Sequence, residues 1–263
     1  MEKVAPDGTA YDLTGPDGAP VLALIHGLGL CRHVWDGLLP DFAQYRVLNY
    51  DLYGHGDSAP TRDTASLAVY SDQLAGLMDH LGIATATVIG FSVGGMINRR
   101  FALDHGERLD ALVILNSPHD RGDAAQAHVE ARALAARDQG AMATMGAALK
   151  RWFTPGYLTT GTGADQVRDW RARADPESYA QAAWVLAHGV RELIRPDPPV
   201  AAPALVMTCA NDSGSTPAMA HAIAAEIAGA ETVIIPQLQH LGLMEAPRAF
   251  TAPILDFLQG TRP

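Results

Sequence analysis

Short runs of mostly apolar residues recur along the chain, separated by longer stretches whose apolar residues fall at helical spacing. The runs are rich in β-branched residues and bounded by turn residues. They cover Val21–Ile25, Arg46–Tyr50, Thr87–Ile89, Leu112–Leu115, Ala204–Thr208 and Thr232–Ile235. Continuous apolarity is typical of a strand buried on both faces, as in the middle of a parallel sheet. These runs are therefore predicted to be parallel strands.

The stretches between the runs have the period of amphipathic helices. In Ser66–Leu81 the apolar residues recur every three or four positions, and Ala218–Ala228 and Ala249–Leu258 look similar. Strands that alternate with helices predict a doubly wound α/β sheet, with helices packed on both of its faces.

This alternation stops between about residues 120 and 200. The stretch is rich in alanine and arginine, has helical periodicity with breaks at Gly140 and Gly161–Gly163, and ends in the proline-rich connector Arg195–Pro203. We interpret it as a helical insertion between two strands. The predicted organisation is an α/β core formed by residues 1–120 and 201–263, and a helical cap formed by residues 121–200.

A serine follows the strand predicted at Thr87–Ile89, in the sequence Gly-Phe-Ser-Val-Gly at Gly90–Gly94. A serine on a tight turn from strand to helix is held in a strained backbone geometry, and small neighbours allow the strand and helix to approach. Its hydroxyl then stands at the carboxyl end of the sheet, with a helix N-terminus behind it. Ser92 is therefore the predicted nucleophile; the alternative is a helix start that merely uses small residues.

A second glycine-containing loop, His26–Gly29, follows the strand predicted at Val21–Ile25. Acyl transfer requires backbone N–H groups aimed at the oxyanion that develops in the reaction. The predicted donors are the N–H groups of Leu28 in this loop and of Val93, directly after the serine. The alternative for the loop is a turn at the end of a strand with a structural histidine.

An aspartate and a histidine follow two later strands. Asp212 comes after Ala204–Thr208, and His240 comes after Thr232–Ile235. The carboxyl ends of the strands in an open α/β sheet face one rim, so Ser92, Asp212 and His240 can converge although they lie far apart in sequence. Singly each is an ordinary loop residue; their joint placement predicts a triad of nucleophile, acid and base.

Taken together, these motifs resemble the α/β-hydrolase superfamily over essentially the full length of the chain. The resemblance is carried by His26–Gly29, Asp51–Ser58 (DLYGHGDS), Gly90–Gly95, Asp212 before Thr216–Pro217, and His240. Within the superfamily the chain is most similar to the 3-oxoadipate enol-lactonase group, on the segments Leu74–Ile83, Arg151–Pro155 and Pro176–Ala180. The resemblance implies an α/β-hydrolase fold with a helical cap, and a serine hydrolase that needs no cofactor.

The chain departs from the family pattern at three places. Tyr53 replaces the usual arginine of its loop, Val93 replaces a methionine, and the spacing from Asp212 to Thr216 is one residue longer. These changes leave the triad intact and bear on the substrate. Asp120 also follows a predicted strand, and since some superfamily members place the acid there, it is the alternative to Asp212.

The cap is expected to enclose the substrate and exclude water. Its candidate pocket walls are Trp152, Phe153, Tyr157 and Trp184, for each of which core packing is the alternative. Arg151, beside Trp152, is the candidate ligand for a substrate carboxylate, because a guanidinium forks onto two oxygens. The alternative is that it is one of several solvent-facing helix arginines. That group would also contain Arg132, Arg137, Arg168, Arg171 and Arg173.

Composition and charge narrow the function further. The 263 residues are 48% hydrophobic and 18% charged, which excludes intrinsic disorder. A net charge of −10 repels phosphate backbones and argues against a nucleic-acid partner. Two cysteines, Cys31 and Cys209, make neither a disulfide framework nor a metal site, and with no nucleotide-binding loop we expect no metal and no cofactor. The polar N-terminus and the short apolar runs predict a cytoplasmic protein with no signal peptide and no membrane partner.

The function predicted from these residues is hydrolysis of a small ester or lactone that carries a carboxylate, through an acyl-enzyme. Three alternatives use the same fold: a carbon–carbon bond hydrolase of ring-cleavage products, a perhydrolase or cofactor-free haloperoxidase, and a receptor-like member with slow turnover. The partner expected is a small-molecule substrate, and no pattern in the chain specifies an oligomeric state.

Overall fold

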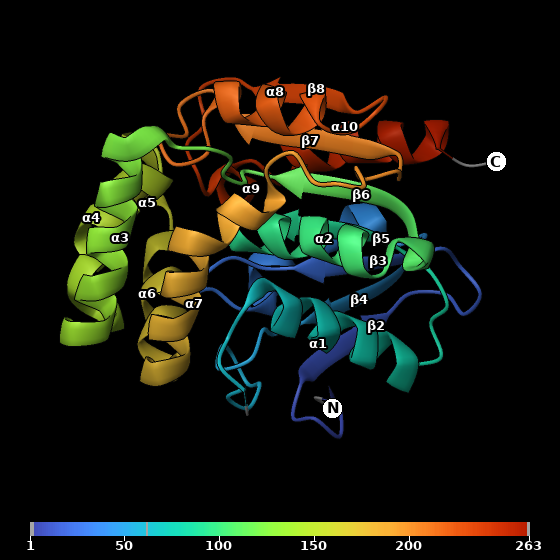
Figure 1. The fold of residues 1–263 in the computed structure, drawn as a ribbon, viewed down its shortest axis with the longest axis horizontal. Helices are drawn as coiled ribbons and strands as arrows, with labels where there is room; N and C mark the ends of the chain where they lie inside the picture. The colour runs from blue at the N-terminus through green and yellow to red at the C-terminus, as the bar shows by residue number, and fades with distance from the viewer. Residues whose placement is uncertain (1–2, 62, 262–263) are drawn as a thin grey trace.

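A single mixed sheet organises the computed structural model, which describes residues 3–61 and 63–261 (Figure 1). Its strand order is β1-β2-β4-β3-β5-β6-β7-β8, and β3 to β8 run parallel while β2 is antiparallel to both of its neighbours. The strands are β1 (Lys3–Val4), β2 (Ala10–Thr14), β3 (Val21–Ile25), β4 (Arg46–Tyr50), β5 (Ala86–Phe91), β6 (Leu109–Leu115), β7 (Ala204–Cys209) and β8 (Glu231–Ile235). The predicted α/β class is thereby confirmed. Residues 1–2 of the polar N-terminal segment lie outside the described residues.

The six predicted strands are all present, and β3 and β4 have the predicted bounds. The others extend the prediction by one to three residues at their ends. The edge strands β1 and β2 escape the prediction, because β1 has two exposed residues and β2 is buried only in its first half. A strand at an edge does not need the continuous apolar sequence of a central strand.

Helices cover both faces of the sheet. One face is covered by α1 (Leu67–His80), α2 (Val93–Asp104) and α8 (Pro217–Ala225), and the other by α10 (Pro247–Gly260) with the short helices η1 (Arg32–Trp35) and η2 (Leu39–Phe42). The first turns of α1 and α8 are capped, since Ser66 Oγ accepts the Val69 N–H at 3.1 Å and Thr216 Oγ1 accepts the Met219 N–H at 3.3 Å. Such caps satisfy N–H groups that lack a partner inside the helix.

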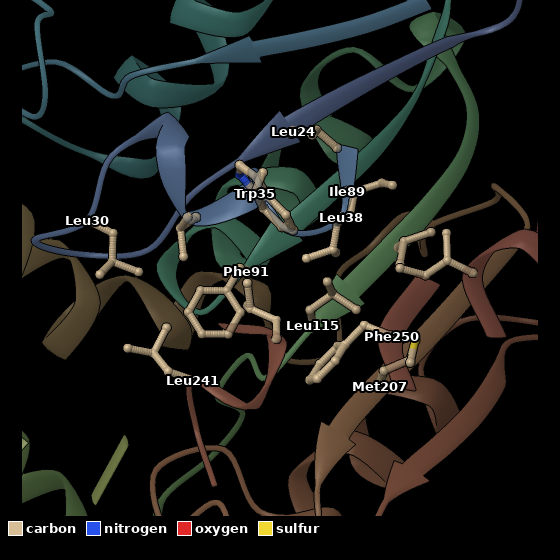
Figure 2. Packing of buried hydrophobic residues seen from close by; sticks show 14 of the residues in the cluster. Leu24, Leu30, Trp35, Leu38, Ile89, Phe91, Leu115, Met207, Leu241 and Phe250 are labelled. Atoms are coloured by element: carbon tan, nitrogen blue, oxygen red, sulfur yellow. The ribbon is translucent and has the colours of Figure 1, made fainter. Parts of the chain in front are cut away.

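Successive residues of the central strands enter different hydrophobic clusters. On β3, Leu22 and Leu24 belong to the cluster beneath α10, whereas Ala23 and Ile25 pack beneath α1 and α2. Figure 2 shows Leu24 on the first of these faces, in the same cluster as Phe91 and Phe250. Burial of both faces explains why β3 is apolar at every position. It also anchors the last residue of β5, Phe91, beside Ser92.

A helical layer stands beside the sheet, on the side toward which the arrows of β6 and β7 point (Figure 1). It is inserted between β6 and β7 and contains α3 (Gly122–Gln139), α4 (Met145–Trp152), α5 (Pro155–Thr160), α6 (Gly163–Arg173) and α7 (Pro176–His188). The helices α3 and α7 pack through small residues, among them Ala133 and Ala183. The layer lies within the predicted range 121–200; that it forms a separate cap domain stays a prediction. None of the described helices has the length and apolarity required to cross a bilayer.

Candidate active site

The turn at Ser92 joins β5 to α2 with almost no intervening residue. Ser92 has φ 58° and ψ −115°, a conformation that L-residues rarely adopt, and it is 8% exposed. A Cβ on Gly90 would lie 2.1 Å from the Gly94 carbonyl oxygen, and a Cβ on Gly94 would lie 2.3 Å from the Ile25 oxygen. Glycine is therefore required at both positions, because the backbones of β5, α2 and β3 approach more closely than any side chain allows.

Ser92, His240 and Asp212 converge at the carboxyl ends of β5, β8 and β7. The Ser92 Oγ lies 3.1 Å from His240 Nε2, and His240 Nδ1 lies 2.6 Å from Asp212 Oδ2. With the carboxylate accepting from Nδ1–H, the neutral imidazole presents an unprotonated Nε2 to the serine hydroxyl. This geometry allows the imidazole to remove the hydroxyl proton as Ser92 attacks a substrate.

The Asp212 carboxylate is held by several donors. Backbone N–H groups of Gly214 and Ser215 donate to Oδ1 at 2.8 and 3.0 Å, and the Asn116 side-chain amide donates to Oδ2 at 2.9 Å. Burial alone would raise the pKa of this carboxyl, but the charge of His240 and the hydrogen bonds from His240, Asn116 and Gly214 outweigh it and hold the pKa below its usual value. Asp212 is thus ionised at neutral pH.

The alternative acid, Asp120, does not meet His240. It is exposed, and its carboxylate accepts the Gly122 N–H at 3.0 Å at the start of α3. The residue at the end of β6 that does reach the triad is Asn116, which the sequence analysis did not single out. Its signal in the sequence was its position directly after a predicted strand.

The loop His26–Gly29 lies against the serine. A Cβ on Gly27 would be 3.2 Å from the Ser92 Cβ, and Gly27 and Leu28 line the same cavity as Ser92. His26 itself is fully buried away from the cavity: its Nδ1 lies 2.8 Å from the Gly27 oxygen, and its Nε2 accepts the Leu52 N–H at 2.9 Å. Val93 is the first residue of α2, where backbone N–H groups have no partner within the helix.

A cavity of about 340 Å³ lies between the triad and the helical layer, within the range of small-molecule sites. Arg151 and Trp152 both line it, and the Trp152 ring is centred 6.1 Å from the His240 ring. Of the four candidate pocket walls, Phe153, Tyr157 and Trp184 do not line this cavity. Phe153 is buried in the core with Tyr157 stacked on it, and Trp184 is 48% exposed and packs on His188.

Three more arginines line the cavity: Arg121, Arg132 and Arg171. The solvent-facing alternative is wrong for Arg171, which is only 2% exposed. It lies four residues after Val167 on the buried face of α6, so the helical period already carried a signal for its burial. Tyr53, which replaces the family's usual arginine, does not line the cavity, and its hydroxyl donates to Asp7 Oδ2 at 2.8 Å.

The described residues hold no cluster of three metal-ligating side chains. Cys31 and Cys209 are free and buried, and burial raises the pKa of each thiol to about 12. A thiol in that state is a poor nucleophile. Neither cysteine lines the cavity, whose wall carries the Ser92 hydroxyl and the His240 imidazole.

Comparison with known proteins places the chain among hydrolases. A family described as alpha/beta hydrolase fold matches residues 20–155. The 3-oxoadipate enol-lactonase 2 of Acinetobacter baylyi is 29% identical over 91% of this chain and 89% of its own. The crystal structure of the enol-lactonase from Burkholderia xenovorans LB400 is 30% identical, with a TM-score of 0.87 over 95% of this chain and 96% of that one. A thermophilic esterase from Thermogutta terrifontis, with malate bound, is 28% identical, with a TM-score of 0.84 over 97% and 94%.

Proposed function

This chain belongs to the α/β-hydrolase fold family, and from that membership and the cavity geometry we propose that it is a serine hydrolase of a small ester or lactone carrying a carboxylate. The observation that carries the proposal is the line of contacts from Ser92 Oγ through His240 to Asp212, at 3.1 and 2.6 Å. These contacts open onto a cavity sized for a small molecule.

In the first step, His240 Nε2 takes the Ser92 hydroxyl proton as Oγ attacks the substrate carbonyl carbon. Asp212 keeps the imidazole in the required orientation and stabilises its positive charge. The carbonyl oxygen becomes an oxyanion, which the backbone N–H groups of Leu28 and Val93 stabilise. One such donor contributes about 3–4 kcal/mol to the stability of the transition state.

In the second step the tetrahedral intermediate collapses. The bond from the carbonyl carbon to the leaving oxygen breaks, and His240 returns its proton to that oxygen. With a lactone the released oxygen stays attached to the acyl chain, so both ends of the opened ring remain in the cavity. Water then attacks the acyl carbon while His240 accepts a proton from it. The bond from that carbon to Ser92 Oγ breaks, His240 returns the proton to Oγ, and the carboxylic acid is released.

The carboxylate in the proposed substrate rests on Arg151 and on the relatives. Arg151 lies on α4 next to Trp152 and lines the cavity. Its Nη1 donates to the Ala147 oxygen, and the other N–H groups of the guanidinium are left to donate to a substrate carboxylate. The enol-lactonases among the relatives favour a lactone. Malate bound to the Thermogutta esterase favours an acidic compound.

The proposal is tested by covalent labelling and turnover of the Ser92→Ala variant. A fluorophosphonate is expected to label the wild-type protein once and the variant not at all, while hydrolysis of a p-nitrophenyl ester falls by several orders of magnitude. Ser71→Ala is the matched control, because Ser71 is buried on α1 outside the cavity. Full labelling of the Ser92→Ala protein would rule out this nucleophile.

A panel of substrates separates the proposed reaction from its alternatives. Acidic enol-lactones, neutral p-nitrophenyl esters and dienone acids are assayed with wild-type and Ser92→Ala protein. Preference for the acidic lactone supports the proposal. Preference for the dienone acid would indicate carbon–carbon bond hydrolysis, and turnover that needs added peroxide would indicate a perhydrolase.

A further inference from the structure

Four arginines carried by three helices line the active-site cavity. Arg121 precedes α3, Arg132 lies within α3, Arg151 on α4 and Arg171 on α6. This arrangement differs from a basic helix face, on which each charged side chain points into solvent. The whole chain carries a net charge of −10, so this gathering of positive charge runs against its composition.

In the part of the chain that the structure describes, the hydrogen bonds of these guanidinium groups go to neutral acceptors. Among the described residues, none of the four forms an ion pair; Arg121 donates to the Leu186 oxygen and Arg171 to Thr144 Oγ1, both neutral acceptors. The one carboxylate that lines the cavity in the described chain is Asp212, whose oxygens are already occupied by His240 and its other donors. Positive charges held together in a half-buried space are costly unless an anion joins them.

The arginines divide into two positions along the cavity. The first is next to the triad: the Arg171 guanidinium lies 5.9 Å from the Trp152 ring, which in turn lies 6.1 Å from the His240 ring, and Arg151 directly precedes Trp152 on α4. The second is on the α3 side and contains Arg121 and Arg132. Tyr179 stands beside Arg171, with the guanidinium 4.8 Å from its ring.

The charges of these arginines also act on one another, both within and between the two positions. Burial and then the charge of Arg151 lower the pKa of Arg132, and burial with a smaller effect of Arg151 lowers that of Arg171. Burial and then Arg132 lower the pKa of Arg121 to about 10, although Asp120 acts in the opposite direction. Each position is therefore electrostatically incomplete, and a bound anion would relieve both burial and repulsion.

We propose that the cavity recognises a molecule with two separate carboxylates, one held by Arg151 and Arg171 next to Ser92 and the other by Arg132 and Arg121 at α3. A single carboxylate satisfies one guanidinium fork and leaves the second position unpaired. A molecule with two carboxylates pairs both positions, and its length sets which bond lies over Ser92. As a statement about substrate, this inference rests on the proposed hydrolase function; the binding itself needs no turnover.

The test is calorimetric binding of inert acids to the wild-type protein. The probes are glutarate, adipate and pimelate, each compared with the monoacid of the same chain length, and propylphosphonate as a single group with two charges. The best diacid is expected to bind roughly 10- to 100-fold more tightly than its monoacid, and more tightly than propylphosphonate, because two charged pairs form instead of one. The advantage should shrink as salt is added.

Arg132→Gln locates the second carboxylate. Arg132 makes no hydrogen bond or ion pair within the described structure, so its loss leaves no internal partner unsatisfied. The variant is expected to reduce diacid affinity to the monoacid level while leaving monoacid affinity within about twofold, and Arg132→Lys should retain part of the advantage. Arg137→Gln is the matched control, an exposed arginine on the same helix, and should change neither affinity.

Several outcomes would overturn the inference. Equal affinities for diacid and monoacid would do so, as would propylphosphonate binding as tightly as the diacid, which would indicate one anion position. An equal loss of monoacid and diacid affinity in Arg132→Gln, with the melting temperature unchanged, would also contradict it. Failure of the hydrolase proposal is distinct, since it would leave the diacid preference intact while no ester or lactone was turned over.

Discussion

The Asn116 side-chain amide donates a hydrogen bond to Asp212 Oδ2 at 2.9 Å, the same oxygen that lies 2.6 Å from His240 Nδ1. Asn116 directly follows β6 and has φ 47°, in the left-handed region. The acid is carried by the next strand, β7. An amide at the end of β6 thus orients a carboxylate at the end of β7, and that carboxylate in turn holds the His240 ring.

Replacing Asn116 by alanine should therefore weaken catalysis through Asp212. The carboxylate would lose a charge-assisted hydrogen bond, which contributes about 1.5–3 kcal/mol, so kcat is expected to fall roughly 10- to 100-fold with KM little changed. Because that bond also lowers the Asp212 pKa, the acidic limb of the kcat profile should move to higher pH. Steady-state kinetics over a range from about pH 5 to about pH 9 measure both effects.

Asn211→Ala is the control for this experiment. Asn211 precedes the acid and is exposed, so its side chain should be replaceable with no change in the pH profile. If Asn116→Ala lowered activity with no shift of the acidic limb, Asn116 would be supporting the fold of the strand ends rather than the charge of Asp212.

The identity of the acid is decided by comparing Asp212→Asn with Asp120→Asn. An amide at position 212 cannot offset the charge of the imidazolium and favours the wrong histidine tautomer, a change that costs about 10⁴-fold in kcat in a serine protease. Asp120 faces solvent, and its replacement should leave kcat close to that of the wild type. A dead Asp120→Asn variant beside an active Asp212→Asn variant would reverse the assignment.

The close approach of α2 to β3 predicts opposite effects of two glycine-to-alanine changes. At Gly94 the new Cβ would meet the Ile25 and His26 oxygens at 2.3 and 2.7 Å, so Gly94→Ala should lower the free energy of unfolding by about 3 kcal/mol or more. At Gly76, an exposed position inside α1, a new Cβ would have no atom within 4 Å. Gly76→Ala should therefore raise the free energy of unfolding by about 0.5–1 kcal/mol. Chemical denaturation of both variants tests this; a stable Gly94→Ala protein would mean that the turn relaxes easily.

Buried histidines should make stability fall as the pH falls below about 6.5. Burial, the neighbouring His55 and Arg32 lower the pKa of His26 to about 3, and burial lowers that of His55 as well. Between pH 6.5 and 3 the unfolded chain binds a proton at position 26 that the folded chain does not, so unfolding takes up protons and becomes easier as acid is added. The loss is up to about 1.4 kcal/mol per pH unit for each such histidine.

Urea denaturation from about pH 7 to 4.5 measures this slope, in a window above the titration of most carboxylates. His26→Gln removes one titrating group while keeping an oxygen that can accept the Leu52 N–H, so the slope should become shallower. His221→Gln, at an exposed position on α8, should leave it unchanged. An unchanged slope in His26→Gln would show that His26 does not control acid stability.

The central strands and the order of the triad residues could be predicted from the sequence. Val21–Ile25 is apolar at every position because both faces of its strand are buried, and the local sequence reflects that requirement. The same holds for Gly90 and Gly94, whose lack of a side chain reflects the backbone contacts of a single turn. Likewise, a residue that follows a parallel strand must stand at the same rim as the other strand ends.

Only the tertiary structure decided which side chains of the helical layer face Ser92. Arg132 and Arg137 lie on the same helix, α3, and nothing near either of them in sequence separates the one that lines the cavity from the one that does not. Trp152 and Trp184 pose the same problem, and packing placed the first beside His240 and the second at the surface. The amino-acid sequence by itself therefore determined the parallel strands of the sheet and the candidate triad residues, because each depends on short-range geometry. The charge and shape of the substrate cavity came from contacts between segments far apart in the chain, which no local pattern encodes.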